Sequence, residues 1–306
     1  MDALISYLRD FVSLDQVLSP AYLLSFVAVG YVIFRWRGHE GGQEGGFWSF
    51  LFPRRIWSSA SVRTDLWLFL IGQLMILFKV GARFGATPLV AAWVVANGPG
   101  PVLEGVTVSP VLMALILLMI TDLSLYWVHR AYHTVKTIWP LHAVHHSAAV
   151  LTPLTAYRQH PVGNLVSLAF NSLLIGTMYG LVIGSLTDDV TFATIAGANA
   201  FIVVLNLVVT NFHHSHIWIS FGPILERILI SPAQHQVHHS TNPVHFNRNF
   251  GQTLAIWDWM FGTLYITRKD EVVSFGLEGE ADAPLMTQRI GPVLIDPLRR
   301  MLRPAQ

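Results

Sequence analysis

Three stretches of this sequence place histidines at helical spacing: His129-Arg-Ala-Tyr-His133, His142-Ala-Val-His145-His146 and His235-Gln-Val-His238-His239. On a helix, residues three or four positions apart share one face, with Cβ atoms roughly 5–6 Å apart. Neutral imidazoles held that close can converge on one or two divalent ions, and without a metal they would repel one another on protonation. The alternative is a set of interfacial histidines with no ligand role, but eight histidines in three clusters favour a metal site.

The number of candidate ligands indicates two metal ions. A tetrahedral catalytic zinc uses three protein ligands, so eight to ten imidazoles are too many for one ion. Two six-coordinate ions offer about twelve positions, which leaves a few for water or O2. Imidazole suits iron, zinc, copper and nickel alike, so the ligand type predicts a dimetal site without identifying the metal.

The composition is that of a membrane protein. Hydrophobic residues make up 53% of the 306 residues and charged residues only 12%, whereas soluble domains carry roughly 25% charged residues. A transmembrane helix needs about 20 mostly apolar residues. Five apolar segments predict an all-α integral membrane helical bundle of about five spans: 18–36, 66–80, 108–128, 161–186 and 190–212. The second is short if it stops at Val80, although it could continue towards Phe84. The stretch 88–96 is too short to cross alone and is expected to be a re-entrant or interfacial piece, or half of a broken helix.

Basic residues predict the orientation of the spans. They concentrate between spans one and two, between three and four, and after span five, so the N-terminus is expected outside and the C-terminus in the cytoplasm. Every histidine except His39 lies between spans three and four or after span five, which predicts a cytoplasmic helical cap around the dimetal site. The expected location is a bacterial inner membrane.

Three regions are expected along the chain. Residues 1–107 form an N-terminal membrane region with two spans and the short apolar stretch, 108–268 form the catalytic membrane domain, and 269–306 form a cytoplasmic tail. Residues 289–303 of this tail could form a basic amphipathic helix on the inner leaflet. No cleavable signal peptide is evident at the N-terminus.

Other classes of site are excluded by composition. The absence of cysteine rules out disulfides, iron–sulfur clusters, thiolate–zinc sites and cysteine nucleophiles. A formal net charge of only +1 gives no indication of a nucleic-acid partner.

The residues around the clusters resemble a known family. Asp122, Tyr126 and Trp127 precede the first cluster, and four further motifs follow: Tyr157-Arg158-Gln159-His160-Pro161, His214-Ser215-His216-Ile217, Asn249-Phe250-Gly251 and Trp257-Asp258-Trp259-Met260-Phe261-Gly262-Thr263. From about residue 122 to 265 the chain resembles the fatty acid hydroxylase and sterol desaturase family of membrane di-iron oxygenases.

The resemblance implies two iron ions, O2 as co-substrate and an external electron donor. It also implies ligation by each histidine of the three clusters: His129, His133, His142, His145, His146, His235, His238 and His239. A further ligand is expected in the stretch His213-His214-Ser215-His216, where His214 matches best and the choice stays open. His160 is the tenth candidate.

Three polar residues are candidates for supporting roles. Asp122 lies inside a predicted span, where an ionisable side chain carries a high free-energy cost and usually has a function. We expect it to orient a ligand imidazole rather than simply pair within the helix. Tyr126 shares the helix face of Asp122. Asn211 is expected either to reach the metals through water or to cap span five. Arg158 could bind a lipid phosphate or extend to the interface.

The expected function is O2-dependent hydroxylation of a lipid C–H bond, with desaturation as the alternative within the family. The three-residue gap between His129 and His133 favours hydroxylation by resemblance to the hydroxylase branch. Since no haem or iron–sulfur domain is visible, the donor should be a separate reductase, ferredoxin or cytochrome b5-like protein. Two other classes remain as rivals: a metal transporter or metal-binding protein, and a b-type haem protein. Both would place ligands inside the bilayer.

Overall fold

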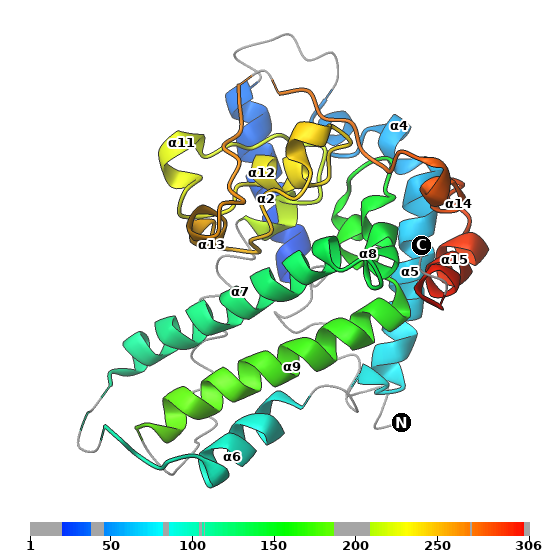
Figure 1. The fold of residues 1–306 in the computed structure, drawn as a ribbon. Coiled ribbons are helices and arrows are strands. Elements are labelled where there is room, and N and C mark those ends of the chain that lie inside the picture. Colours follow the sequence, from blue (N-terminus) through cyan, green and yellow to red (C-terminus); the bar gives the residue numbers. More distant parts are fainter. Residues whose placement is uncertain are drawn as a thin grey trace.

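The fold is helical in every part of the chain that the structure describes (Figure 1). The computed structural model describes residues 20–37, 46–81, 86–103, 106, 108–186, 209–269 and 271–302. Within these ranges there is no strand, and extended pairing is limited to isolated bridges between Leu229 and Leu254 and between Ser240 and Phe275. The all-α prediction is confirmed for the described residues.

Three of the described helices are long and apolar enough to cross a membrane: α5 (Ala60–Leu77), α7 (Pro110–Thr134) and α9 (Pro161–Gly184). Each leaves large apolar side chains exposed, for example Leu74 (52%), Leu112 (50%) and Leu173 (56%). Such surfaces are typical of lipid contact, so the chain is a membrane protein. The segment expected at 18–36 forms helix α2 (Pro20–Arg37). The segment expected at 190–212 lies outside the described residues except for 209–212.

The short apolar stretch predicted at 88–96 forms α6 (Thr87–Asn97), which lies along α9 (Figure 1). Gly81, after α5, lies beside Leu168 of α9, and the backbone N–H of Ala86 donates to Ser172 Oγ (3.1 Å). Gly81 after α5 and Ala86 before α6 therefore both lie against α9. α6 has 11 residues, which is too short to cross a membrane alone, as expected for this stretch.

Small residues allow α6 and α9 to approach closely. A Cβ added to Gly176 would lie 2.6 Å from Val90 Cβ and 2.8 Å from the carbonyl oxygen of Thr87, and Gly180 has the same relation to Val94. Regularly spaced small residues in membrane helices permit this kind of backbone contact.

The remaining helices are short and gather at one end of α7 and α9 (Figure 1), and we call this helical region the cap without reference to a side of the membrane. In chain order they are α3 (Phe47–Leu51), α4 (Arg54–Trp57), α8 (Trp139–His146), η2 (Pro153–Tyr157), η3 (Thr210–Phe212), α11 (Gly222–Leu225), α12 (Pro232–His238), η4 (Pro243–His245), α13 (Ile256–Met260), η5 (Glu280–Asp282), α14 (Ala283–Met286) and α15 (Ile290–Leu302). Many begin with proline in the first turn, where its missing N–H costs no hydrogen bond.

The C-terminal tail packs against the cap. The helix expected over 289–303 forms as α15, and its Val293 is fully buried in a cluster with Leu68 of α5 and Val144 of α8. The apolar face of α15 is thus used in part for packing on α8, which carries three of the candidate ligands.

We predict that Gly176→Ala destabilises the protein by about 1–3 kcal/mol, because the new methyl group must displace the α6 backbone or Val90. The measurement is thermal unfolding in detergent. The matched control is Gly72→Ala in α5, where an added Cβ meets nothing within 4 Å and the higher helix propensity of alanine favours the fold. Equal melting temperatures for the two variants would contradict the described α6–α9 packing.

Candidate metal centre

Nine of the ten predicted ligands lie in two adjacent groups. The five-histidine group comprises His129, His133, His142, His146 and His238. The four-histidine group comprises His145, His214, His235 and His239. Within each group one ring nitrogen per residue lies within 4.8 Å of the others. The ring of His146 in the first group stacks on the ring of His239 in the second at a centroid distance of 4.4 Å, so the two groups are in direct contact.

Two short helices supply both groups at once. Successive residues on a helix point about 100° apart, so His145 and His146 at the end of α8 face different groups. On α12, His235 and the C-cap His239 are four residues apart and face the four-histidine group, while His238 faces the other. The i, i+3, i+4 pattern therefore lets each of the two helices supply histidines to both groups.

Local sequence fixes the start of α12. Ser231 caps the helix: its Oγ accepts from the N–H of Gln234, while Oε1 of Gln234 accepts from the N–H of Ser231. The buried carboxylate of Glu226 in turn accepts from Ser231 Oγ (2.8 Å) and from the N–H of Thr267 (2.9 Å). These contacts hold the helix that carries His235 and His238.

Carbonyl oxygens select the ring nitrogen that faces inward. Nδ1–H of His129 donates to Phe250 O and Nδ1–H of His238 donates to Arg248 O, both at 2.8 Å. A carbonyl only accepts, so the proton is on Nδ1 and the Nε2 lone pair is left free. Such a partner on the outer nitrogen is usual for a metal-bound histidine.

The inner nitrogens fit metal ions. In the five-histidine group, Nε2 of His133, His146 and His238 is buried and has no hydrogen-bond partner. In the four-histidine group, the Nε2 atom of His214 lies 3.1 Å from that of His145 and 2.9 Å from that of His235. Burial also lowers the pKa of His145 to about 3, which keeps the ring neutral at pH 7. Converging neutral imidazoles with free lone pairs can hold a metal ion in each group.

The structure corrects the prediction for His160. This residue is the N-cap of α9: its Nδ1 accepts from the N–H of Val162 (3.2 Å) and its Nε2 bonds to Leu294 O (3.0 Å). Both ring nitrogens are used away from the two groups, so His160 fastens α15 to α9.

Of the three histidines at 213–216, the structure brings His214 to the metal centre. His213 lies against Ile230 O (3.4 Å) and stacks on the His235 ring, while Nε2 of His216 donates to Phe50 O (2.8 Å). The sequence spacing alone could not make this choice.

Asp122 does not orient a ligand imidazole directly, contrary to expectation. Its carboxylate accepts from the N–H groups of Thr253 and Leu254 and from the indole of Trp257, each at 3.0 Å. It therefore anchors the loop before α13 to α7. Trp257 is buried in this contact.

Tyr126 and Asn211 also lie outside the two groups. Tyr126 is buried, and its hydroxyl bonds to Thr263 Oγ1 (3.0 Å) and accepts from Arg130 (2.9 Å). Asn211 donates to the carbonyl oxygen of Tyr22 (3.1 Å). Both residues join separate segments of the cap and membrane helices.

Two supporting carboxylates were not singled out as site residues from the sequence. Asp258 accepts from the N–H groups of Phe250 and Gly251 (2.8 Å each), so it holds the carbonyl that receives His129. Asp65 forms a fully buried ion pair with Arg158 (2.7 Å), and Arg158 also donates to Val144 O on α8. Arg158 therefore neither binds a lipid phosphate nor extends to the interface.

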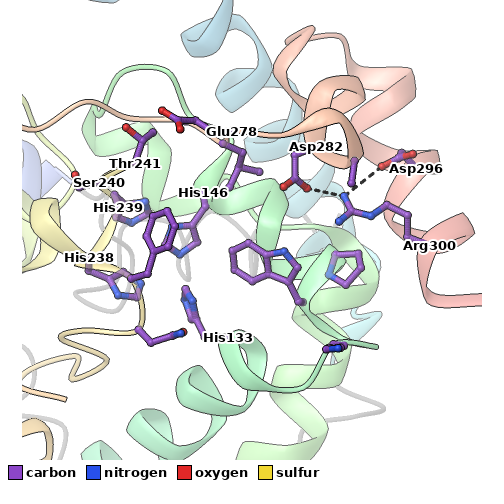
Figure 2. A pocket seen from close by; sticks show the side chains of 18 residues that line it. His133, His146, His238, His239, Ser240, Thr241, Glu278, Asp282, Asp296 and Arg300 are labelled. Atoms are coloured by element: carbon purple, nitrogen blue, oxygen red, sulfur yellow. Dashed lines mark hydrogen bonds and ion pairs between the residues drawn. The ribbon is translucent and has the colours of Figure 1, made fainter. Parts of the chain in front are cut away.

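A cavity of about 710 Å³ borders the metal centre (Figure 2). Its inner wall contains His133, His146, His238 and His239. On the far side, Arg300 pairs with Asp282 (2.7 Å) and Asp296 (3.6 Å). The cavity thus joins the histidines to a charged rim made by the C-terminal tail.

We predict that His146→Ala lowers the metal content of the purified protein, since it removes one of five converging nitrogens, and that His160→Ala leaves it unchanged. Loss of one ligand or its support typically costs 10–100-fold in affinity, on the order of 1–3 kcal/mol. The measurement is elemental analysis of both variants after equal dialysis. Equal loss of metal in both would contradict the ligand assignment.

The metal-free protein should lose stability as the pH falls. Burial lowers the pKa of His145 from 6.5 to about 3 and that of His213 to about 4. The unfolded chain therefore binds more protons below its own pKa, so stability present above about pH 6.5 declines progressively at lower pH. Melting temperatures of chelator-treated protein between about pH 8 and pH 5 test this prediction. A constant or rising melting temperature on acidification would refute it.

Comparison with known proteins agrees with this geometry. Residues 114–263, which include both histidine groups, match the family model described as fatty acid hydroxylase. The chain is 32% identical over 156 residues to the alkylglycerol monooxygenase of Xenopus tropicalis, covering 51% of this chain and 31% of that protein. It is 32% identical over 158 residues to the human alkylglycerol monooxygenase, with the same coverage of 51% and 31%.

A bacterial relative is also similar. The ornithine lipid hydroxylase OlsE of Rhizobium tropici is 27% identical over 178 residues, which are 57% of this chain and 48% of that protein. The chain thus spans about a third to a half of the length of these curated relatives. No solved structure matches it significantly. The match across both histidine groups shows that the chain belongs to the fatty acid hydroxylase family.

Proposed function

We propose that this protein is a membrane oxidoreductase that uses O2 and two electrons to hydroxylate a C–H bond of a lipid at a pair of iron ions. The observation that carries the proposal is the pair of adjacent all-histidine groups, with nine inward-facing rings, at the end of apolar helices. The reaction consumes O2, two electrons and two protons for each C–H bond converted to C–OH, and releases one water.

Iron is proposed because of the family and the donor set. An all-nitrogen site also suits zinc or copper, but the relatives are named as monooxygenases and hydroxylases, and zinc has no redox chemistry. Bound iron would supply O2 activation and attack on an unactivated C–H bond. Five ligands in one group and four in the other leave positions for O2 on six-coordinate ions.

The protein's own residues prepare the site. Burial keeps His145 neutral so that it can ligate, and the carbonyl oxygens of Phe250 and Arg248 fix the tautomers of two further ligands. Asp258 and Asp122 hold the loop that provides the Phe250 carbonyl. We propose supporting roles of this kind for Asp122, Tyr126 and Asn211, which contact backbone or side chains rather than the metals.

The electron donor is proposed to be a separate protein, such as a reductase, a ferredoxin or a cytochrome b5-like carrier. The cavity with the charged rim around Arg300 offers a polar route to His133 and His239. The distribution of basic residues supports a cytoplasmic position for this face, in a bacterial inner membrane.

The proposed substrate is a membrane lipid with a hydrocarbon chain. The relatives named above act on an alkylglycerol and on an ornithine lipid. Desaturation is the second candidate, because the same ligands could support removal of two hydrogens. The two reactions differ in product: one adds an oxygen atom and the other adds none.

We predict that cells expressing the protein under ¹⁸O2 accumulate a lipid carrying one ¹⁸O atom, and that His214→Ala abolishes it because a converging nitrogen is lost. The control is His216→Ala in the same stretch, whose ring contacts Phe50 instead. Lipid mass spectrometry with immunoblotting for equal protein is the measurement. A lipid lacking two hydrogens would indicate desaturation, and an unchanged lipid profile in iron-loaded cells would overturn the proposal.

A further inference from the structure

A second cavity lies between α5 and α9, away from the charged one. It has a volume of about 550 Å³ and is lined mainly by apolar side chains of both helices, among them Leu68, Met75, Ile76, Leu165 and Leu168. Polar lining residues include Gln73, Lys79 and Asn164. This volume is within the usual range for small-molecule sites. We refer to it as the α5–α9 groove.

The surroundings of the groove indicate the chemistry of an occupant. Both walls belong to helices apolar enough to cross a membrane, and neighbouring side chains on the same helices, such as Leu70 (42%) and Phe170 (53%), are exposed. The medium beside these helices is hydrocarbon, so the molecules that reach the groove are lipid chains. Most of the lining side chains are apolar, so a hydrocarbon chain in the groove would cover little polar surface.

One end of the groove reaches the metal centre. Gln159 lines the groove, and its amide lies 3.1 Å from Nδ1 of His145. Nε2 of His145 points into the four-histidine group, close to His214. The contacting atom of Gln159 is its amide nitrogen Nε2, so Gln159 touches the outer ring nitrogen of His145 while Nε2 of that ring faces the other histidines. An occupant of the groove would thus lie against the side chain that holds a metal ligand.

The other cavity is poorly suited to a hydrocarbon chain. Its rim carries Lys136 and Glu278 together with the Arg300–Asp282 ion pair. Covering such groups with methylenes would remove their hydration without replacing it. The two cavities therefore differ in character. The first carries several charged side chains and borders mainly the five-histidine group, whereas the groove is largely apolar, with Lys79 as a charged lining residue, and reaches His145 of the four-histidine group through Gln159.

We propose that the α5–α9 groove binds the hydrocarbon chain of the lipid substrate and directs it towards Gln159 and the four-histidine group. The identification of the bound lipid as the substrate rests on the proposed function. The binding of a lipid chain in the groove stands on the groove's own geometry.

Gly72 provides a direct way to fill the groove. It lies within α5, lines the groove, and an added Cβ would meet nothing within 4 Å. Gly72→Phe therefore places a ring in the space proposed for the chain without a backbone clash. The matched control is Leu70→Phe, two residues earlier on the same helix, where the side chain is exposed and does not line the groove.

The first experiment locates the chain. Full-length, metal-loaded protein in detergent is photolysed with a trace of phosphatidylcholine that carries a diazirine in one acyl chain, and labelled peptides are counted by mass spectrometry. Labelling of α5 and α9 groove residues is expressed relative to the lipid-facing α7 residues Leu112 and Leu115 of the same molecule. Excess unlabelled phosphatidylcholine should lower this ratio, since a site saturates and a general lipid surface does not.

The expected result is a roughly tenfold lower ratio in Gly72→Phe and an unchanged ratio in Leu70→Phe. The ¹⁸O product should fall in parallel in Gly72→Phe, while its iron content and melting temperature stay those of the wild type. A ratio that neither saturates nor responds to Gly72→Phe would overturn the groove assignment even if lipid hydroxylation is intact. If the labelling ratio saturates and falls in Gly72→Phe, but the protein makes no oxygenated lipid, the result would support lipid binding in the groove and overturn the proposed function.

Discussion

The candidate site depends on keeping nine imidazole rings, seven of them on buried residues and two on half-buried ones, neutral and aimed at two points. Each ring would be protonated in part in water near pH 6.5, but burial lowers the pKa of ligands such as His145 and His146. A protonated ring among them would face several like charges in a medium that screens poorly. Metal ions bound by these rings would take the place of the protons, so the arrangement suits a site for cations that imidazole ligates.

Holding that arrangement requires rigid support from distant parts of the chain. Glu226 and the Ser231 cap fix α12, and Asp258 fixes the loop that receives His129. The buried Arg158–Asp65 pair joins α5 to α8. Removing one partner of such a pair is typically strongly destabilising, by about 3–5 kcal/mol. These polar contacts explain why a protein that is 53% hydrophobic buries so many charged and hydrogen-bonding groups at one end.

Much of the site could be predicted because ligand spacing is local. The i, i+3, i+4 pattern of α8 and α12 identifies candidate ligands such as His142 and His238 from sequence alone. The roles of Asp122 and His160 could not be predicted, since their partners lie 131 to 135 residues away for Asp122 and 134 away for His160. Composition likewise predicted the apolar helices, whereas the contact of α6 with α9 depends on long-range packing of glycines.

The account rests on two metal ions per chain with imidazole as the protein ligand. X-ray absorption at the iron edge, combined with iron and protein quantitation on the purified membrane protein, tests this most directly. The expected result is about two irons per chain with nitrogen scatterers at roughly 2.0–2.2 Å, the range usual for histidine ligation. One ion per chain, or a first shell dominated by oxygen, would contradict the two-group histidine site.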